Sequence, residues 1–233
     1  GIRAMYGGDA AGHSVATTHS AEGKSYAAAT RNIEDGISYL QTGESVLLEV
    51  ANLATRLREL GIQADNAALL ATATQVAAMN SEAILIGDTI DQILDKTDFN
   101  TVEVVDSAGA KTVAVNYVGE ASGTTFTTGP GVAITAMGNI TAAAGADGTA
   151  DTMLGKLAEA LGNIAADLTA LKAFQGAASA TSANLMASSA RLMDTDYALE
   201  TANLTKNSIL NQAALSMAAQ ANSAQSAILS VLQ

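Results

Sequence analysis

The sequence predicts a mostly α-helical protein: a long antiparallel coiled-coil-like bundle, a small β-hairpin region and a C-terminal helical segment. Hydrophobic residues make up 48% of the 233 residues but aromatic residues only 3%, and much of the hydrophobic content is Ala. That composition suits long helices packed side by side. Several stretches also repeat apolar residues at alternating three- and four-residue steps, and one stretch rich in Val, Thr and Gly interrupts them.

Charge and cysteine content exclude several classes of function. The formal net charge is −12, and the 11 Lys and Arg residues are scattered along the chain. A nucleic-acid-binding protein needs a basic face, and a polybasic membrane anchor needs clustered cations. The absence of Cys excludes disulfides, thiolate catalysis and Cys-based zinc sites.

The first predicted helix covers residues 14–62. Its apolar residues recur at heptad-like steps, with charged residues opposite, and Gly61 fits a helix C-cap. The predicted stripe consists of Tyr39, Val46, Val50, Leu53, Leu57 and Leu60.

The second predicted helix covers residues 65–96, with Asp65 as its N-cap. Glu82, Asp88, Asp91 and Asp95 lie mostly off its apolar stripe. Asp91, Asp95 and Asp98 are expected to form a solvated helix face and its terminus. The stripe consists of Val76, Met79, Ala83, Ile86, Ile90 and Ile93.

Residues 102–148 change in texture and predict short strands. The segments "TVEVV", "TVAVNYV" and "GVAIT" have strand character, and "DSAGA" fits a hairpin turn between the first two.

The third predicted helix begins near Thr149 and keeps a three-four repeat for more than five heptads, which favours coiled-coil-like packing. Three stretches with matching seams predict a bundle. The repeat consists of Leu154, Leu157, Leu161, Ile164, Leu168, Leu171, Gln175, Ala178, Ser182, Leu185, Ser189 and Leu192.

The last 27 residues, 207–233, contain no charged residue, Gly or Pro. They repeat the heptad step at Leu210, Ala214, Met217, Ala221, Ala224, Ile228 and Val231. Twelve of the 27 are Ser, Asn or Gln, which argues against a membrane span. A helix exposed on its back normally carries charges there, so this helix is expected to pack on more than one side.

No catalytic, cofactor or metal site is predicted. His13 and His19 are six residues apart, so they do not share a helix face, and two solvent-facing histidines are expected. A carboxylate pair at Asp194 and Asp196 fits a helix cap better than acid–base catalysis. The glycine-rich "GGDAAG" lacks the residues of a phosphate-binding loop.

Two ordered sets of motifs resemble bacterial flagellin. The C-terminal set is "DTDYA" at 194–198, Lys206, "ILNQA" at 209–213 and "QAN" at 220–222. The N-terminal set is "GDAAG" at 8–12, "ATRNIEDGISYLQTGESVL" at 29–47, "TRLRELGIQA" at 55–64 and "KTDFNTVEV" at 96–104. In the last motif the family usually has Gly where this chain has Thr101.

The resemblance implies a structural subunit of the extracellular flagellar filament, not an enzyme, that self-assembles for swimming after type III export. It implies as partners other flagellin subunits, the export chaperone, hook-associated and cap proteins, and a Toll-like innate receptor. It also implies that an N-terminal helix of the family precedes this sequence. The expected divisions are 1–101 (bundle helices), 102–148 (β-rich variable region), 149–193 (bundle helix) and 194–233 (inner-tube helix).

The predicted sites follow from the seam and from the resemblance. Receptor contacts are expected at Arg56, Leu60 and Glu82. Two alternatives are a hook–filament junction protein and a flagellin-like cell-surface binding protein. The residues expected in chaperone binding or inner-tube packing are Ile209, Leu210, Ala214, Met217, Ala221, Ala224, Ile228, Leu229, Val231 and Leu232.

Overall fold

A computed structural model describes residues 9–66, 72–105, 111–114, 125–130, 134, 137–138, 140–194 and 196–231, with only the helical backbone at 229–231. The mostly helical fold class is confirmed, and the chain divides into two compact units, residues 20–186 and residues 1–19 with 187–233. The elements are α1 (Ala10–Asp65), α3 (Ala73–Lys96), β1 (Asp98–Phe99), β2 (Val102–Glu103), β3 (Lys111–Ala114), β4 (Thr125–Thr128), α4 (Ala146–Met193) and α5 (Tyr197–Val231).

Helix α1 is longer than predicted at both ends. Asp9 caps it, because its Oδ1 accepts a hydrogen bond from the Gly12 N–H at 2.8 Å. The prediction that Gly61 ends the helix is wrong, since α1 continues to Asp65. Gly61 instead allows a close approach: a Cβ there would collide with the backbone of Asp147 at the start of α4.

Helix α3 begins at a different cap from the one predicted. Asp65 lies in the last turn of α1, and the N-cap is Thr72. Thr72 and Gln75 form a capping box in which each side chain accepts a hydrogen bond from the other residue's backbone N–H. The positive charge of Lys96 in the last turn interacts favourably with the negative end of the helix dipole.

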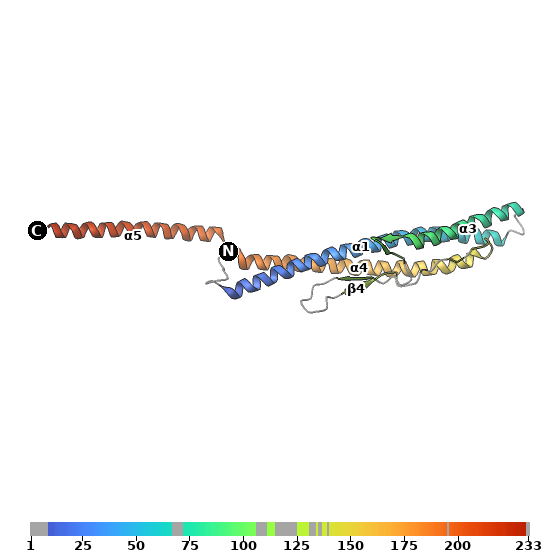
Figure 1. The fold of residues 1–233 in the computed structure, drawn as a ribbon, viewed down its shortest axis with the longest axis horizontal. Helices are drawn as coiled ribbons and strands as arrows, with labels where there is room; N and C mark the ends of the chain where they lie inside the picture. The colour runs from blue at the N-terminus through green and yellow to red at the C-terminus, as the bar shows by residue number, and fades with distance from the viewer. Residues whose placement is uncertain are drawn as a thin grey trace. The chain divides into compact units, whose positions relative to one another are not determined.

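Helices α3 and α4 run alongside α1 (Figure 1). As residue numbers rise along α1, the residues of α4 that they contact fall in number, so the two helices are antiparallel. A Cβ at Gly36 would lie 3.5 Å from Leu171 Cδ1, and one at Gly43 would lie 3.6 Å from Ile164 Cδ1. Further along, Arg58 Nε pairs with Asp151 Oδ1 at 2.6 Å.

The core of the 20–186 unit follows the predicted stripes but is broader on α1. Because α1 packs against both other helices, it also buries Ile33, Leu40, Leu47 and Ala54, which the single predicted stripe omits. On α4 the heptad positions Leu157, Ile164, Leu171 and Ala178 are buried, while the alternate positions Leu154, Leu161 and Leu168 are only partly buried. The buried residues of α3 are Ala83, Gly87, Ile90 and Leu94.

The strand pairing differs from the prediction. β2 pairs back with β1, and β3 pairs with β4, so the two predicted strands do not form one hairpin. "DSAGA" at 106–110 lies outside the described residues. Of "GVAIT" only Ile134 is described, and it is in no strand.

The turn between β1 and β2 contains an unfavourable residue. Asn100 and Thr101 have φ values of 51° and 63°, as a type I′ two-residue turn requires. Asn tolerates this conformation, but a β-branched Thr does so only with strain. The chain therefore forms the turn without a Gly at either of these two positions.

Helix side chains hold the end of β4 and the irregular chain after it. Asp167 Oδ2 accepts hydrogen bonds from Thr128 Oγ1 and Gly129 N, both at 3.0 Å. Asp91 Oδ1 accepts one from Met137 N at 2.7 Å, and Asn80 Oδ1 accepts one from Ala143 N at 2.9 Å. The prediction that Asp91 lies on a solvated face is therefore wrong.

Candidate functional site

Helix α5 is the part of the described chain with the most exposed apolar surface. Asp196 caps it, because Asp196 Oδ1 accepts hydrogen bonds from Ala198 N at 3.0 Å and Leu199 N at 3.1 Å. This confirms the predicted cap. Every side chain from 196 to 228 is exposed.

The predicted seam of α5 lies along one face and is uncovered. Leu210 is 56% exposed, Met217 71% and Ile228 63%, whereas Leu157 in the seam of α4 is 1% exposed. The Ala residues between them, Ala214, Ala221 and Ala224, are also exposed. We call these six residues the α5 seam.

Other predicted seam residues stand apart from this set. Ile209 is exposed, but at 100° per residue it lies about 90° around the helix from the seam. Leu229 and Val231 belong to the helical backbone, but their side chains lie outside the described residues, as does Leu232 entirely.

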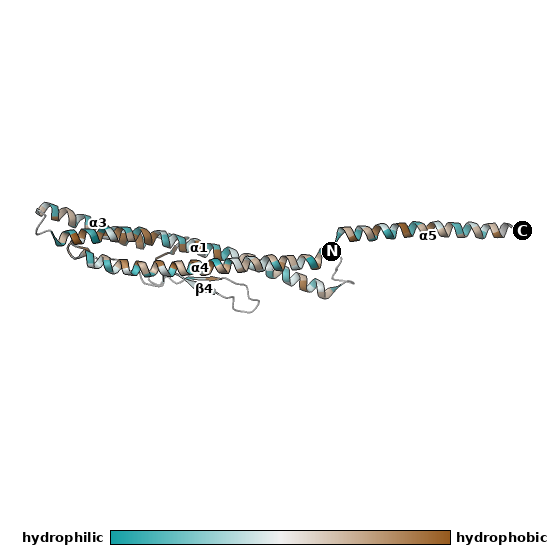
Figure 2. Cartoon of the chain, turned by 180° about the vertical axis from the view of Figure 1, so that it is seen from behind, coloured by the Kyte–Doolittle hydropathy of each residue, from teal (hydrophilic) through white to brown (hydrophobic). Residues whose placement is uncertain are grey.

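A second apolar stripe lies on the opposite face of α5 and was not predicted. Tyr197, Leu204 and Leu215 are exposed and lie roughly 130° around the helix from the seam. The spacings of seven and eleven residues between them return to nearly the same helix face, and this was the signal in the sequence that could have predicted the stripe. Figure 2 shows apolar residues recurring along α5.

The polar residues of α5 beyond Lys206 carry no charge that would offset its exposed apolar surface. Glu200 and Lys206 are the last ionisable side chains, and the surface beyond them is Ala, Ser, Asn and Gln around the apolar stripes. Exposed apolar surface of this extent marks an interaction site. The hydroxyl and amide groups suit hydrogen bonding to a neighbour without desolvating a charge.

The second predicted surface joins α1 to α3. Arg56 Nε and Nη2 donate to Glu82 Oε1 at 2.9 and 2.8 Å, and Nη1 donates to Glu59 Oε2 at 3.2 Å. The hydrogen bond with Glu82 is the main cause that raises the pKa of Arg56. Arg56 and Glu82 are exposed, but Leu60 is 1% exposed and packs inside the bundle, so it offers no contact to a receptor on this surface.

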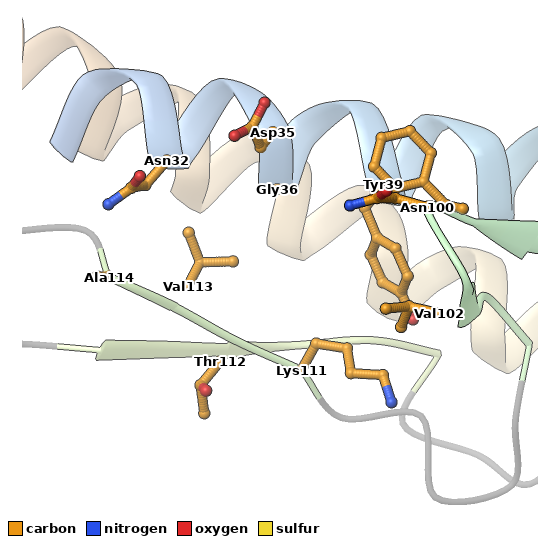
Figure 3. Close-up of a pocket in the computed structure, with 11 residues that line it drawn as sticks. Asn32, Asp35, Gly36, Tyr39, Asn100, Val102, Lys111, Thr112, Val113 and Ala114 are labelled. Atoms are coloured by element: carbon orange, nitrogen blue, oxygen red, sulfur yellow. The ribbon is translucent and has the colours of Figure 1, made fainter. Parts of the chain in front are cut away.

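A cavity of about 460 Å³ lies between α1 and the strands. Figure 3 shows Asn32 and Asp35 of α1 on one side and β3 on the other, with Val113 directed toward α1. Its ionisable groups include one carboxylate, Asp35, and one ammonium, Lys111. Both are accessible to water, which screens them, so the cavity selects weakly for a charged ligand.

The two histidines are half-buried, so the prediction that they face solvent is wrong. His19 Nδ1 lies 3.0 Å from Ser188 Oγ, and His13 Nδ1 is buried without a hydrogen-bond partner among the described residues. Within the described ranges, no three His, Asp or Glu side chains gather as metal ligands would. None of the helices in those ranges has a stretch that is both long enough and apolar enough to cross a bilayer.

Comparison with known families and relatives gives a consistent result at both ends of the chain. Residues 3–110 match the bacterial flagellin N-terminal helical region, and residues 146–232 match the bacterial flagellin C-terminal helical region.

Curated relatives match over most of their length. A flagellin of Halalkalibacterium halodurans is 34% identical over 239 residues, covering 97% of this chain and 86% of the relative. A flagellin of Bacillus subtilis is 28% identical over 265 residues, covering 97% and 87%. The flagellar filament core protein flaB2 of Brachyspira hyodysenteriae is 28% identical over 258 residues, covering 97% and 86%.

A solved structure also resembles the chain. The crystal structure of Bacillus cereus flagellin aligns with 75% of this chain and 94% of that chain, at 24% identity and a TM-score of 0.44.

Proposed function

This chain belongs to the bacterial flagellin family, and from that membership we propose that α5 is the surface through which it joins neighbouring subunits. As a flagellin it is a structural subunit of the extracellular flagellar filament, not an enzyme. The observation that carries the proposal is the exposed α5 seam.

The energy of covering the seam supports this role. Full burial of one Leu, Met or Ile side chain contributes about 1.5–3 kcal/mol. Leu210, Met217 and Ile228 are each more than half exposed, so most of this contribution remains available to a partner. Alternation of these side chains with Ala lets a partner helix approach closely.

The opposite stripe supports packing on more than one side. A helix with apolar residues on two faces and no charge along its last turns is suited to a position between other helices. In a homopolymer those helices come from identical copies. The surface of α5 would therefore be covered repeatedly along the filament.

We infer that the same seam binds the export chaperone before assembly. An amphipathic helix with its apolar face uncovered fits the groove of a helix-binding partner, and covering it prevents premature association. Removing residues 207–233 is expected to abolish binding to the cognate chaperone in a pull-down or calorimetric titration. Unchanged binding would contradict the assignment. Contacts with cap and hook-associated proteins are proposed through the same terminus.

The assembly proposal is tested by two variants that each introduce one negative charge, on different faces of α5. Ala221→Asp puts a carboxylate in the seam, whereas Ser223→Asp puts it roughly 90° or more away from both apolar stripes. Both variants are made in the full natural protein that carries this sequence and expressed in cells without their own flagellin. We expect filaments by electron microscopy from Ser223→Asp and none from Ala221→Asp. Equal behaviour of the two variants would refute the proposal.

Receptor recognition at Arg56 and Glu82 is a second proposal. Their ion pair supports this proposal. Both side chains are exposed, so a partner at the surface can replace either of their hydrogen bonds with one of its own. A Toll-like receptor reporter assay compares the parent protein with Arg56→Ala. An active parent and a weaker variant are expected, and an inactive parent would refute it.

A further inference from the structure

Met217 combines a reactive group with a position at the centre of the α5 seam. Its side chain is 71% exposed, whereas Met137 and Met153 are 8% and 4% exposed in the bundle core. A thioether that water and small oxidants reach freely is oxidised far more readily than one in a packed core.

We propose that Met217 is an oxidative modification site, and that its sulfoxide prevents the free subunit from joining the filament. This rests on the proposed role of α5 in assembly. The oxidant is hydrogen peroxide: the sulfur lone pair attacks one of its oxygens, the O–O bond breaks, and an S–O bond forms. Sulfur loses two electrons and the peroxide gains two. The proton of the attacked oxygen passes to the departing hydroxide, which leaves as water.

The surroundings of Met217 explain why this change matters. The seam residues around it, Leu210, Ala214, Ala221 and Ala224, carry no side-chain hydrogen-bond donor. In the free subunit, water solvates the sulfoxide oxygen. Once a partner helix covers the seam, that oxygen loses water and gains no donor from the other seam residues.

The size of the effect follows from the cost of an unpaired polar group. At about 1–3 kcal/mol for such a group, and 1.4 kcal/mol per tenfold, the critical concentration for filament growth should rise on the order of ten- to a hundredfold. The same packing covers the sulfur, so incorporated subunits should be oxidised at Met217 much more slowly than free ones.

A second exposed methionine provides an internal control. Met186 is 42% exposed on α4, outside the α5 seam, and its side chain lies beside Gly23 of α1. Its oxidation is expected to leave filament growth unchanged.

The experiment uses the full natural protein that carries this sequence, treated with dilute hydrogen peroxide, and growth from sheared filament seeds. Peptide mass spectrometry should find Met217 oxidised first among the described methionines. The growth of each protein is compared with that of the same protein left untreated. Treatment should reduce growth of wild type and of Met186→Leu, and it should leave the growth of Met217→Leu as it was before treatment. Leu replaces Met with little change in volume, and it leaves the other methionines in place. Methionine sulfoxide reductases acting on both epimers should restore growth of treated wild type.

The outcomes separate the two ideas. Loss of growth by treated Met217→Leu, resistance of Met217 to oxidation, or unimpaired growth of wild type oxidised at Met217 would each overturn the inference. Normal growth of untreated Ala221→Asp in the same assay would refute the assembly role itself, and the inference with it.

Discussion

Helices α4 and α5 repeat apolar residues at the same three- and four-residue steps, yet only one of them has its seam covered. In α4 the heptad positions Leu157, Ile164 and Leu171 are at most 2% exposed. In α5 the equivalent repeat through Leu210, Met217 and Ile228 is more than half exposed. Heptad spacing therefore says that a helix needs a partner, not that the partner lies in the same chain.

The two helices differ in the charges that they expose on the faces away from their seams. Helix α4 exposes Asp151, Glu159 and Lys172, as a helix that is solvated on one side should. Helix α5 carries a second apolar stripe, and beyond Lys206 it exposes no charge. The difference in charge separates a helix that completes its packing on folding from one that completes it on assembly.

The largest effect on subunit stability should come from the seam of α4. Leu157→Ala removes a fully buried side chain, so it should lower the free energy of unfolding by about 2–5 kcal/mol. Urea denaturation of the isolated subunit measures it. A loss below about 1 kcal/mol would mean that the α4 seam is not the core that the comparison assumes.

A smaller loss is expected where α1 approaches α4. Gly61→Ala places a methyl group against the backbone of Asp147, which cannot rotate away. Overpacking of this kind should destabilise the subunit by about 1–3 kcal/mol, again by urea denaturation. A stabilised variant would show that Gly61 has no packing role.

Gly155 on α4 is the matched control, because a Cβ there meets nothing within 4 Å. In an exposed helix interior, Gly155→Ala should stabilise the subunit by about 1 kcal/mol. Opposite signs at Gly61 and Gly155 in thermal unfolding would confirm that only one side of α4 is packed against α1. The same sign at both positions would contradict it.

The sequence predicted what periodicity determines and missed what tertiary contact determines. The helices, most of the core stripes and the α5 seam follow from repeat spacing. Gly61 was predicted to be a cap because a glycine near a helix end and a glycine where two helices pack closely give the same sequence pattern. Asp91 looked solvated because its partner, the Met137 N–H, lies 46 residues away. Leu60 was expected to contact a receptor by resemblance, although its place in the predicted apolar stripe already indicated the buried position that the structure shows.

The strand pairing was missed for a related reason. The predicted hairpin joined the two nearest apolar runs, but β1 and β2 are only two residues each, too short to show alternation. Asn100 and Thr101 also lack the glycine that usually marks a type I′ turn.

If α5 is held mainly by its own local interactions, its cap should matter more to it than to the bundle. Asp196→Ala removes the hydrogen bonds to Ala198 N and Leu199 N, at a local cost of about 1 kcal/mol. Amide hydrogen exchange should quicken in the first turns of α5 while α1 and α4 stay unchanged. Asp194→Ala removes the same charge two residues earlier without touching the cap, and it should leave α5 exchange as it was. Equal quickening in both variants would mean that charge, not capping, is responsible.

The smallest effect on subunit stability should come from the α5 seam itself, although the substitution is the same as at Leu157. Leu210→Ala deletes a side chain that is 56% exposed and is outside the buried core. The free energy of unfolding of the isolated subunit should change by less than about 0.5 kcal/mol. The critical concentration for filament growth should nevertheless rise severalfold, because the lost apolar surface is surface that a neighbour would bury. A loss of subunit stability as large as that of Leu157→Ala would place a covering partner for α5 within the same chain, and α5 would then be a second α4.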